Sequence, residues 1–408
     1  MTINAAVGQA QVMDAREAGM QAAHQALNAL TQRPGAFSGS TRPSLCLVIV
    51  PHRYDPQLVI SGVASMLSYQ PGVSSETIPI IGMSVSSGLT ENGVHAHSVI
   101  VAILDGDSLE TRIGWFANYS QSSGETAVQL GKMPLHAEKP LKQVLIFADG
   151  LLSNTNDFCS KLPADLPVSG GLSSGDALNL NSFQIAGMES GSGALAAAFL
   201  YGDFSIGSGH AHGWHALGLP VRITATHEFS IKTINDQPAA LTYSQLFGQT
   251  AAAWCSHPLN TLSRIYPLGF EQSTSPELVL RAPIHMETDG SLRLNSIPTQ
   301  GSNAYLMVGS PADSQKAARQ AAQQALLNLG TAKPVFALVL VDIAWQTLLQ
   351  AHPGQEIRAI QEIIGNKIPI AGGYTTGQLL PPVDPGATAR FANQEILVLL
   401  FGETEKQE

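Results

Sequence analysis

A short glycine-rich segment has the residue types to carry a nucleophile. Residues 171–175, Gly-Leu-Ser-Ser-Gly, match the Gly-x-Ser-x-Gly pattern that places a hydrolase serine on a tight strand-to-helix turn. In such enzymes a helix follows the serine directly. The residues after Asp176 instead favour a loop and then a strand, so we expect a structural turn. A hydrolase with Ser173 as its nucleophile is the weaker alternative.

The same segment could bind an anion. Glycine lets backbone N–H groups approach a carboxylate closely, and serine hydroxyls add further donors. This chemistry favours a ligand-binding turn that contains Gly170, Gly171, Ser173, Ser174 and Asp176. The alternative is a tight turn whose hydroxyl groups bond to their own backbone.

Three histidines lie within six residues and could ligate a metal. On an extended segment His210 and His212 would point the same way, and the turn at Gly213 could bring in His215. Zinc and heme iron both accept imidazole ligands. No carboxylate lies within the cluster, so hydrogen-bonded turn histidines are the favoured interpretation. Trp214, the indole inside the cluster, is a candidate ligand contact.

Two arginines stand in apolar surroundings that are typical of strands. The first is Arg222, between Val221 and Ile223, and the second is Arg281, between Leu280 and Ala282. An arginine that faces inward needs a carboxylate partner or a ligand. Both are therefore candidate ligand contacts, although an outward strand face is favoured for Arg222 and is an equal alternative for Arg281.

A repeated pattern indicates which elements hold these residues. Pro-(Ile/Val)-x-Gly, followed by two hydroxyl residues and glycine, occurs at residues 79–88, 167–175 and 369–377. An apolar run of strand length precedes each copy, and another run, ending on glycine and an acid, follows it. We therefore expect one structural unit to be used three times.

The predicted fold is α/β, with repeated helix-strand-helix-strand-strand units that form mixed sheets. Continuously apolar runs such as residues 45–50 suit strands covered on both faces. Residues 221–234 predict a hairpin, and a helix is expected from Ala239. At 408 residues the chain exceeds the usual size of a single core. We expect two domains, residues 1–238 and 239–408, that share an interface.

Composition limits the partners and the compartment. The formal charge of -10, without a long basic run, disfavours nucleic acid and anionic membranes. Cys46, Cys159 and Cys255 are too far apart to indicate a disulfide framework. No apolar run approaches the roughly 20 residues that cross a bilayer, and the amino terminus lacks a signal-peptide pattern. These features predict a cytoplasmic protein.

The order of several short segments resembles that of the FIST family, whose members carry an amino-terminal and a carboxyl-terminal FIST domain. The segments that carry the resemblance are Gly82 with Gly88, Gly170-Gly171 with Gly175-Asp176, Gly213-Trp214 with residues 217–224, residues 234–239, Tyr243, residues 267–269, Arg281, residues 289–292 and Ile297-Pro298 with Gly301. The resemblance covers most of the chain.

The resemblance implies a sensory module that binds small molecules such as amino acids and acts beside signal-transduction proteins. Some FIST proteins hold heme and sense nitric oxide. This chain shows no kinase, cyclase, methyl-accepting or F-box segment, so we expect a separate signalling partner in trans. We therefore predict a non-enzymatic ligand-binding protein without a cofactor. The alternative is a heme or metal sensor that uses His210, His212 and His215.

Overall fold

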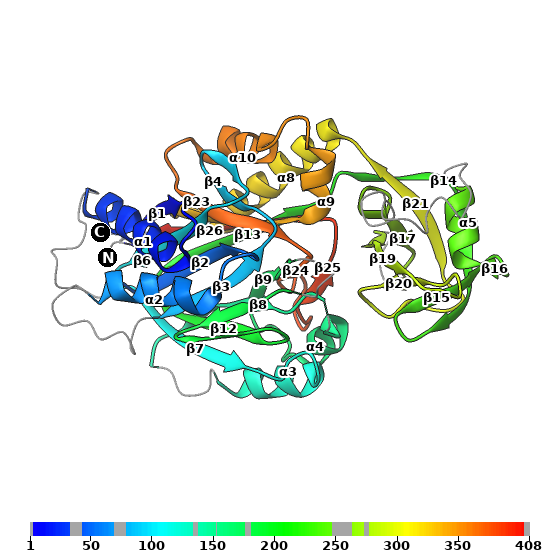
Figure 1. The fold of residues 1–408 in the computed structure, drawn as a ribbon, viewed down its shortest axis with the longest axis horizontal. Helices are drawn as coiled ribbons and strands as arrows, with labels where there is room; N and C mark the ends of the chain where they lie inside the picture. The colour runs from blue at the N-terminus through cyan, green and yellow to red at the C-terminus, as the bar shows by residue number, and fades with distance from the viewer. Residues whose placement is uncertain are drawn as a thin grey trace.

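Four sheets organise the chain. The structure, a computed structural model, describes residues 3–32, 43–68, 79–133, 138–151, 153–175, 181–246, 263–272 and 277–403. These residues form three six-stranded mixed sheets and one eight-stranded antiparallel sheet. In Figure 1 the three mixed sheets are gathered in one body, the eight-stranded sheet lies to its right, and both termini lie on the left. The predicted α/β class with mixed sheets is confirmed.

The first unit shows why the local sequence forms these elements. Asp14 caps the first helix by accepting a hydrogen bond from the Glu17 backbone N–H (2.7 Å), and the second helix starts on a proline behind the cap Asp55. The elements are β1 (Asn4–Ala10), α1 (Ala15–Thr31), β2 (Leu45–Pro51), α2 (Pro56–Leu67), β3 (Ile80–Val85), β4 (Gly88–Thr90), β5 (Gly93–His95) and β6 (Val99–Asp105).

The second and third units repeat this order. The second consists of β7 (Leu109–Phe116), α3 (Ser123–Lys132), β8 (Leu141–Ala148), α4 (Thr155–Lys161), β9 (Val168–Leu172), β10 (Gln184–Ala186), β11 (Glu189–Gly191) and β12 (Leu195–Gly202). The third consists of β13 (Ser205–Ala211), α8 (Pro311–Leu329), β22 (Lys333–Asp342), α9 (Ile343–Leu348), α10 (Gln355–Ile364), β23 (Ile370–Thr375), β24 (Gly377–Leu380), β25 (Arg390–Ala392) and β26 (Ile396–Glu403). The expected triplication is confirmed.

The units exchange their short hairpins in a closed ring. In each mixed sheet the central strands come from one unit, for example β6, β2 and β3, and the last two strands come from another. The β10–β11 hairpin of the second unit pairs with β3 of the first, β24–β25 of the third pairs with β9 of the second, and β4–β5 of the first pairs with β23 of the third. No unit completes its sheet without a neighbour.

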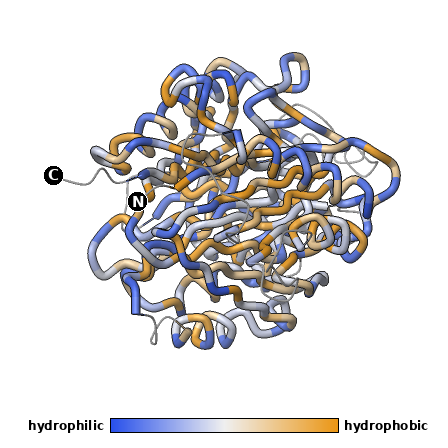
Figure 2. Tube along the Cα trace, turned by 90° about the vertical axis from the view of Figure 1, so that its left-hand side faces the viewer, coloured by the Kyte–Doolittle hydropathy of each residue, from blue (hydrophilic) through white to orange (hydrophobic). Residues whose placement is uncertain are grey.

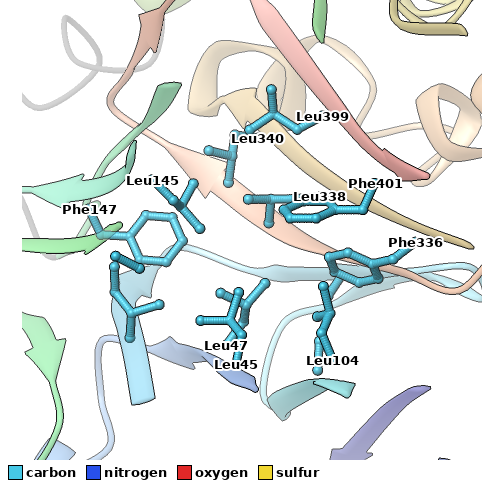
Figure 3. Packing of buried hydrophobic residues seen from close by; sticks show 14 of the residues in the cluster. Leu45, Leu47, Leu104, Leu145, Phe147, Phe336, Leu338, Leu340, Leu399 and Phe401 are labelled. Atoms are coloured by element: carbon cyan, nitrogen blue, oxygen red, sulfur yellow. The ribbon is translucent and has the colours of Figure 1, made fainter. Parts of the chain in front are cut away.

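The three sheets enclose a common apolar core. Figure 3 shows Leu45 and Leu47 of β2, Leu145 and Phe147 of β8, and Leu338 of β22 pointing into it. The residues between them point outward and are covered by helices, as are those of β2 beneath α1 and α2. Both faces of these strands are therefore buried, which explains their unbroken apolar sequence. In Figure 2 many of the hydrophobic segments lie toward the centre of the molecule.

The eight-stranded sheet is inserted between β13 and α8. We call residues 214–309 the inserted module and the rest of the described chain the body. Its elements are β14 (Trp214–His227), β15 (Ser230–Ile234), β16 (Gln237–Pro238), α5 (Ala239–Gln245), β17 (Leu268–Phe270), β18 (Val279–Arg281), β19 (Pro283–Met286), β20 (Leu292–Leu294) and β21 (Asn303–Gly309). The predicted hairpin over residues 221–234 is present as β14 and β15.

The expected domain boundary at Pro238 falls inside this sheet. Strand β14 precedes Pro238 and pairs with β21 beyond it, and β15 likewise pairs with β20. The eight-stranded sheet thus continues across the expected boundary. The division of the chain into two domains, residues 1–238 and 239–408, stays a prediction. None of the described helices is both long and apolar enough to cross a membrane.

Candidate functional site

The three hydroxyl-glycine turns meet one another at the centre of the body. The backbone N–H of Ser86 donates to Tyr374 O (3.3 Å), that of Ser174 to Ser84 O (3.1 Å), and that of Thr376 to Leu172 O (3.0 Å). Each bond runs from one unit to the next, so the three bonds form a ring. The turns thus converge on each other and join the units.

The candidate residues of the second turn are deeply buried. The Ser174 hydroxyl donates to Tyr374 O (2.6 Å) and accepts from the Ser86 N–H (2.6 Å), while the Ser173 hydroxyl accepts from Gln184 Nε2 (2.6 Å). Both serines are fully buried. Their hydroxyl groups therefore have hydrogen-bond partners within the protein, and the partner of Ser173 is the side-chain amide of Gln184. Asp176 lies outside the described residues.

Gly170 and Gly171 lie in β9, where they allow close packing. A Cβ on Gly170 would overlap the carbonyl oxygen of Ile146 in β8, and one on Gly171 would lie 3.0 Å from Leu340 Cδ1. Neither glycine has a positive φ. The need for glycine is explained here by contact between protein strands, and a ligand role for the two residues stays a prediction.

The acidic residues that end the central strands act as local caps. Asp342 accepts hydrogen bonds from the backbone N–H groups of Ala344 (3.0 Å) and Gln394 (2.9 Å). Asp149, at the corresponding place in the second unit, accepts from the Leu151 N–H (3.2 Å) and from the Ser182 hydroxyl (3.2 Å). Both carboxylates therefore have hydrogen-bond donors within the protein, mainly backbone N–H groups.

The three histidines have separate partners. His210 Nδ1 lies 2.7 Å from Glu395 Oε2, His212 Nδ1 accepts from the Trp214 N–H (3.2 Å), and exposed His215 lies 3.3 Å from Asp313 Oδ1. Burial lowers the pKa of His212, which favours its neutral form. Among the described residues, no cluster of three or more metal-ligating side chains is found. The described residues therefore hold no assembled ligand set for a metal ion, and the heme alternative, which can rest on a single histidine, stays a prediction.

Trp214 and Arg222 have different environments. The buried Trp214 indole donates its N–H to Gln394 O (3.1 Å), which fixes the start of the inserted module on the body. Arg222 is exposed, and its backbone N–H donates to Asn235 Oδ1 (2.8 Å). The outward strand face favoured for Arg222 by its sequence is thus observed.

Arg281 is the candidate that lines a pocket. This pocket has a volume of about 210 Å³ and lies where the inserted module meets α4 of the body. Its wall includes Arg281 and Ser296, with Glu271 and Thr299 from the module and Asn156 from α4. The site therefore lies at a boundary between two parts of the chain.

The guanidinium of Arg281 is buried without a carboxylate partner. Its Nε donates to Ser296 Oγ (2.7 Å), Nη1 to Leu280 O (2.8 Å) and Nη2 to Phe391 O (3.3 Å). Its carbon centre lies 4.7 Å from the centre of the Phe391 ring, a cation–π contact. Because arginine has five N–H donors, two have no acceptor among the described residues. No salt bridge to Arg281 is formed within that part of the chain.

Burial and, to a smaller extent, the nearby positive charge of Arg390 lower the pKa of Arg281 to about 10, although the negative charge of Glu395 acts in the opposite direction. The group still carries its charge at neutral pH. A cation with an exposed fraction of 6 % and no carboxylate in contact is costly, because its hydration is lost without an opposite charge at ion-pair distance; Glu395 acts only from beyond that distance. A bound anion would supply that charge.

Glu271 and Ser296 were not identified from the sequence. Glu271 accepts from Asn303 Nδ2 (2.9 Å) and the Tyr305 hydroxyl (3.0 Å), which holds its carboxylate at the pocket. Neither residue stands in a motif. Glu271 joins Arg281 in the pocket wall through the pairing of β17 with β18, and Ser296 does so through the loop after β20.

Two family models match the sequence of this chain. A family model of the FIST N domain matches residues 44–237, and one of the FIST C domain matches residues 239–381. No curated protein matches the chain.

Solved structures show only distant similarity. A chorismatase has 9% sequence identity and a TM-score of 0.37, covering 99% of this chain and 100% of its own. A cyanuric acid hydrolase from A. caulinodans has 15% identity and a TM-score of 0.23, covering 48% of this chain and 70% of its own. T. maritima PurL complexed with AMPPCP has 10% identity and a TM-score of 0.24, covering 98% of this chain and 72% of its own. Similarity at this level carries no argument about function.

Proposed function

The chain belongs to the FIST family, and we propose that it is a sensory protein that binds a small carboxylate, such as an amino acid, in the Arg281 pocket. FIST domains are sensory domains, so ligand binding in signalling is the general role. The observation that carries the specific proposal is the buried guanidinium in the pocket wall, which has free N–H donors and no carboxylate partner in the described chain.

A carboxylate suits this site by charge and by shape. The planar guanidinium can donate two parallel hydrogen bonds to the two carboxylate oxygens, and charge-assisted bonds of this kind are stronger than neutral ones. Ser296 and the Phe391 carbonyl hold Arg281 in place before a ligand arrives. Less side-chain entropy is then lost on binding.

An amino group on the ligand would have a partner in the same pocket. Glu271 lines it and is oriented by Asn303 and Tyr305. A carboxylate at Arg281 together with an ammonium group at Glu271 gives the zwitterion of an amino acid. This pairing supports an amino acid over a simple dicarboxylate.

The position of the pocket suggests how binding is passed on. Arg281 belongs to the inserted module, but its Nη2 bonds to Phe391 in β25 of the body, and Asn156 of α4 also lines the pocket. A ligand that favours one docking geometry of module and body would shift the population toward it. In our proposal a separate signal-transduction protein senses that shift.

Calorimetric titration with amino acids and small carboxylates tests the proposal. We expect saturable binding that raises the melting temperature, because the ligand stabilises the folded state. Arg281→Lys keeps the charge but loses the planar fork, and should weaken binding about tenfold or more, since charge-assisted hydrogen bonds contribute about 1.5–3 kcal/mol. The matched control is Arg222→Lys, at an exposed arginine outside the pocket.

Two results would contradict this site. Equal loss of affinity in both arginine variants would show a nonspecific charge effect, and unchanged affinity in Arg281→Lys would move the ligand elsewhere. Glu271→Gln adds a separate check, because it should weaken amino acids more than simple carboxylates of the same length.

In this proposal the chain acts by binding, without a catalysed reaction. The alternative nucleophile, Ser173, is fully buried and accepts a hydrogen bond from Gln184. We expect Ser173→Ala to leave any ester hydrolysis by the purified protein unchanged. A loss of hydrolysis in a variant that still unfolds cooperatively would revive the hydrolase alternative.

A further inference from the structure

Three residues occupy corresponding positions in the three units. The first strand of each unit pairs with the last strand so that Ala10 lies opposite Val99, Phe116 opposite Leu195, and Ala211 opposite Ile396. The opposing residue opens the last strand in every case. Counting three residues onward from Ala10, Phe116 and Ala211 gives Met13, Tyr119 and Trp214.

Two of these three large side chains are covered, and the third is not. Tyr119 is 0% exposed, packs edge-on against Phe158 (5.4 Å between ring centres) and lies under α3 and α4. Trp214 is 3% exposed, at the junction with the inserted module. Met13 is 101% exposed. In the second and third units this position is covered by other parts of the chain. In the first unit a large apolar side chain is exposed to solvent at the same position.

A preformed hollow lies beside Met13. It has a volume of about 340 Å³ and is lined by Gln11, Val12, Met13, Arg53, Tyr54 and His97, which we call the Met13 surface. The Tyr54 hydroxyl lies 2.7 Å from Val12 O and 2.9 Å from His97 O, so it ties the two loops of the hollow together.

The junction under the inserted module is built in the same way. Trp345, at the position that corresponds to Tyr54, donates its indole N–H to Gln394 O (2.9 Å), and Gln394 corresponds to His97. Trp214 donates to the same carbonyl oxygen. The Met13 surface is therefore the uncovered counterpart of a surface on which this chain already docks a folded module.

The charges of the Met13 surface favour an acidic partner. Arg53 is exposed and makes no ion pair with the described residues. His97 is exposed beside it. The two nearest acids on the chain, Asp14 and Asp55, lie at the N-termini of α1 and α2, where they accept from the Glu17 and Gln57 N–H groups and the positive ends of the helix dipoles offset part of their charge. A carboxylate from outside would complement this surface.

We propose that the Met13 surface docks an acidic segment of a partner protein, with an apolar side chain of the partner covering Met13 and a carboxylate pairing with Arg53. Such an anchor with a charged rim is the usual composition of a protein interface. A second copy of this chain fits less well, because a symmetric contact would set Arg53 against the Arg53 of the other copy without a carboxylate between them. This surface shares no lining residue with the Arg281 pocket, so the inference does not depend on the proposed ligand.

Fluorescence anisotropy with two labelled peptides tests the inference on the full chain. One short peptide carries a tryptophan flanked by aspartates, and the other has asparagine in place of every aspartate. We expect the acidic peptide to bind about tenfold more tightly or better, and Arg53→Gln to remove that difference. Met13→Ser should weaken the acidic peptide about tenfold. Leu327→Ser, at an apolar residue of α8 that is 79% exposed, should change nothing.

Each other outcome overturns the inference. Equal affinity for the two peptides, an unchanged preference in Arg53→Gln, or no saturable binding of the acidic peptide up to millimolar concentration would each exclude an acidic partner at this surface. Sedimentation of the unlabelled protein provides the remaining check. A dimer that Met13→Ser dissociates would assign the surface to a second copy. Unchanged thermal unfolding confirms that the variants are folded.

Discussion

At the scale of single residues, the repeated glycine of the Pro-(Ile/Val)-x-Gly pattern has one physical explanation. Gly82, Gly170 and Gly372 occupy equivalent places in β3, β9 and β23. A Cβ at any of them would overlap a carbonyl oxygen of the neighbouring parallel strand. None has a positive φ, so it is the close approach of two strands that requires glycine.

Gly170→Ala should therefore destabilise the protein. The added methyl group meets backbone atoms of Ile146 that cannot move without shifting β8 in the core, and we expect a loss of about 1–3 kcal/mol in the free energy of unfolding. Denaturant titration measures this loss. Gly191→Ala is the control, since its Cβ would find only Trp115 at 3.5 Å. Equal stability of the two variants would contradict the explanation.

At the scale of elements, the exchanged hairpins make the three units depend on one another. The hairpin strands β4, β10 and β24 are only three or four residues long, and hairpins this short are not stable alone. Each is held by a strand of another unit and by the ring of bonds between the turns. The hydroxyl-glycine turns thus serve as junctions between units.

The contact between α10 and β23 contains an unusual buried acid. The Tyr374 hydroxyl donates to Glu356, whose second carboxyl oxygen, Oε2, is buried without a partner among the described residues. Burial raises the pKa of Glu356 above its ordinary value of 4.5, while the bond from Tyr374 lowers it in part. The folded state therefore favours the neutral acid more strongly than the unfolded state does. Stability falls as the pH rises from about 4.5 toward the raised pKa.

Glu356→Gln should raise the melting temperature at pH 7, because the amide is neutral at every pH. The gain should shrink in acid, where Glu356 is protonated as well, and melting curves across this range measure it. Glu362→Gln on the same helix is the control. Arg319 lowers the pKa of the exposed Glu362, so this variant should lose a little stability at pH 7. A destabilised Glu356→Gln variant at pH 7 would show that the charge is needed.

At the scale of the whole molecule, the inserted module is an addition to a body that closes on itself. In the first unit only residues 11–14 connect β1 to α1, whereas in the third unit residues 212–310 connect β13 to α8. All three mixed sheets of the body are formed by strands outside the inserted module. The body should therefore keep its fold without the module.

Replacing residues 212–310 by the sequence of residues 11–14 tests this independence. We expect cooperative unfolding at a lower melting temperature, because the surface around Trp345 and Phe391 loses its cover. The response to carboxylates should disappear with Arg281. Circular dichroism and calorimetry measure both. A shortened chain that does not fold would show that the module completes the core.

Much of the fold could be predicted from the sequence, because the relevant signals are local and repeated three times. The apolar runs, the cap at Asp14 and the hairpin over residues 221–234 each depend on neighbours along the chain. The exchange of hairpins could not be predicted, since nothing local distinguishes pairing within a unit from pairing with the next. The insertion of the module could not be predicted either, because strands on both sides of Pro238 belong to one sheet.

The same difference between local and long-range information applies to the candidate site. By itself the sequence determined the triplicated unit, the places of glycine and hydroxyl residues, and an arginine in apolar surroundings, because composition and spacing fix them. Only the tertiary structure decided that the hydroxyls of Ser173 and Ser174 are buried at a junction between units. It also decided that Arg281 lines a pocket and has no carboxylate that pairs with it in the described chain. The physical reason is that burial and charge pairing depend on segments far apart in the chain, which only folding brings together.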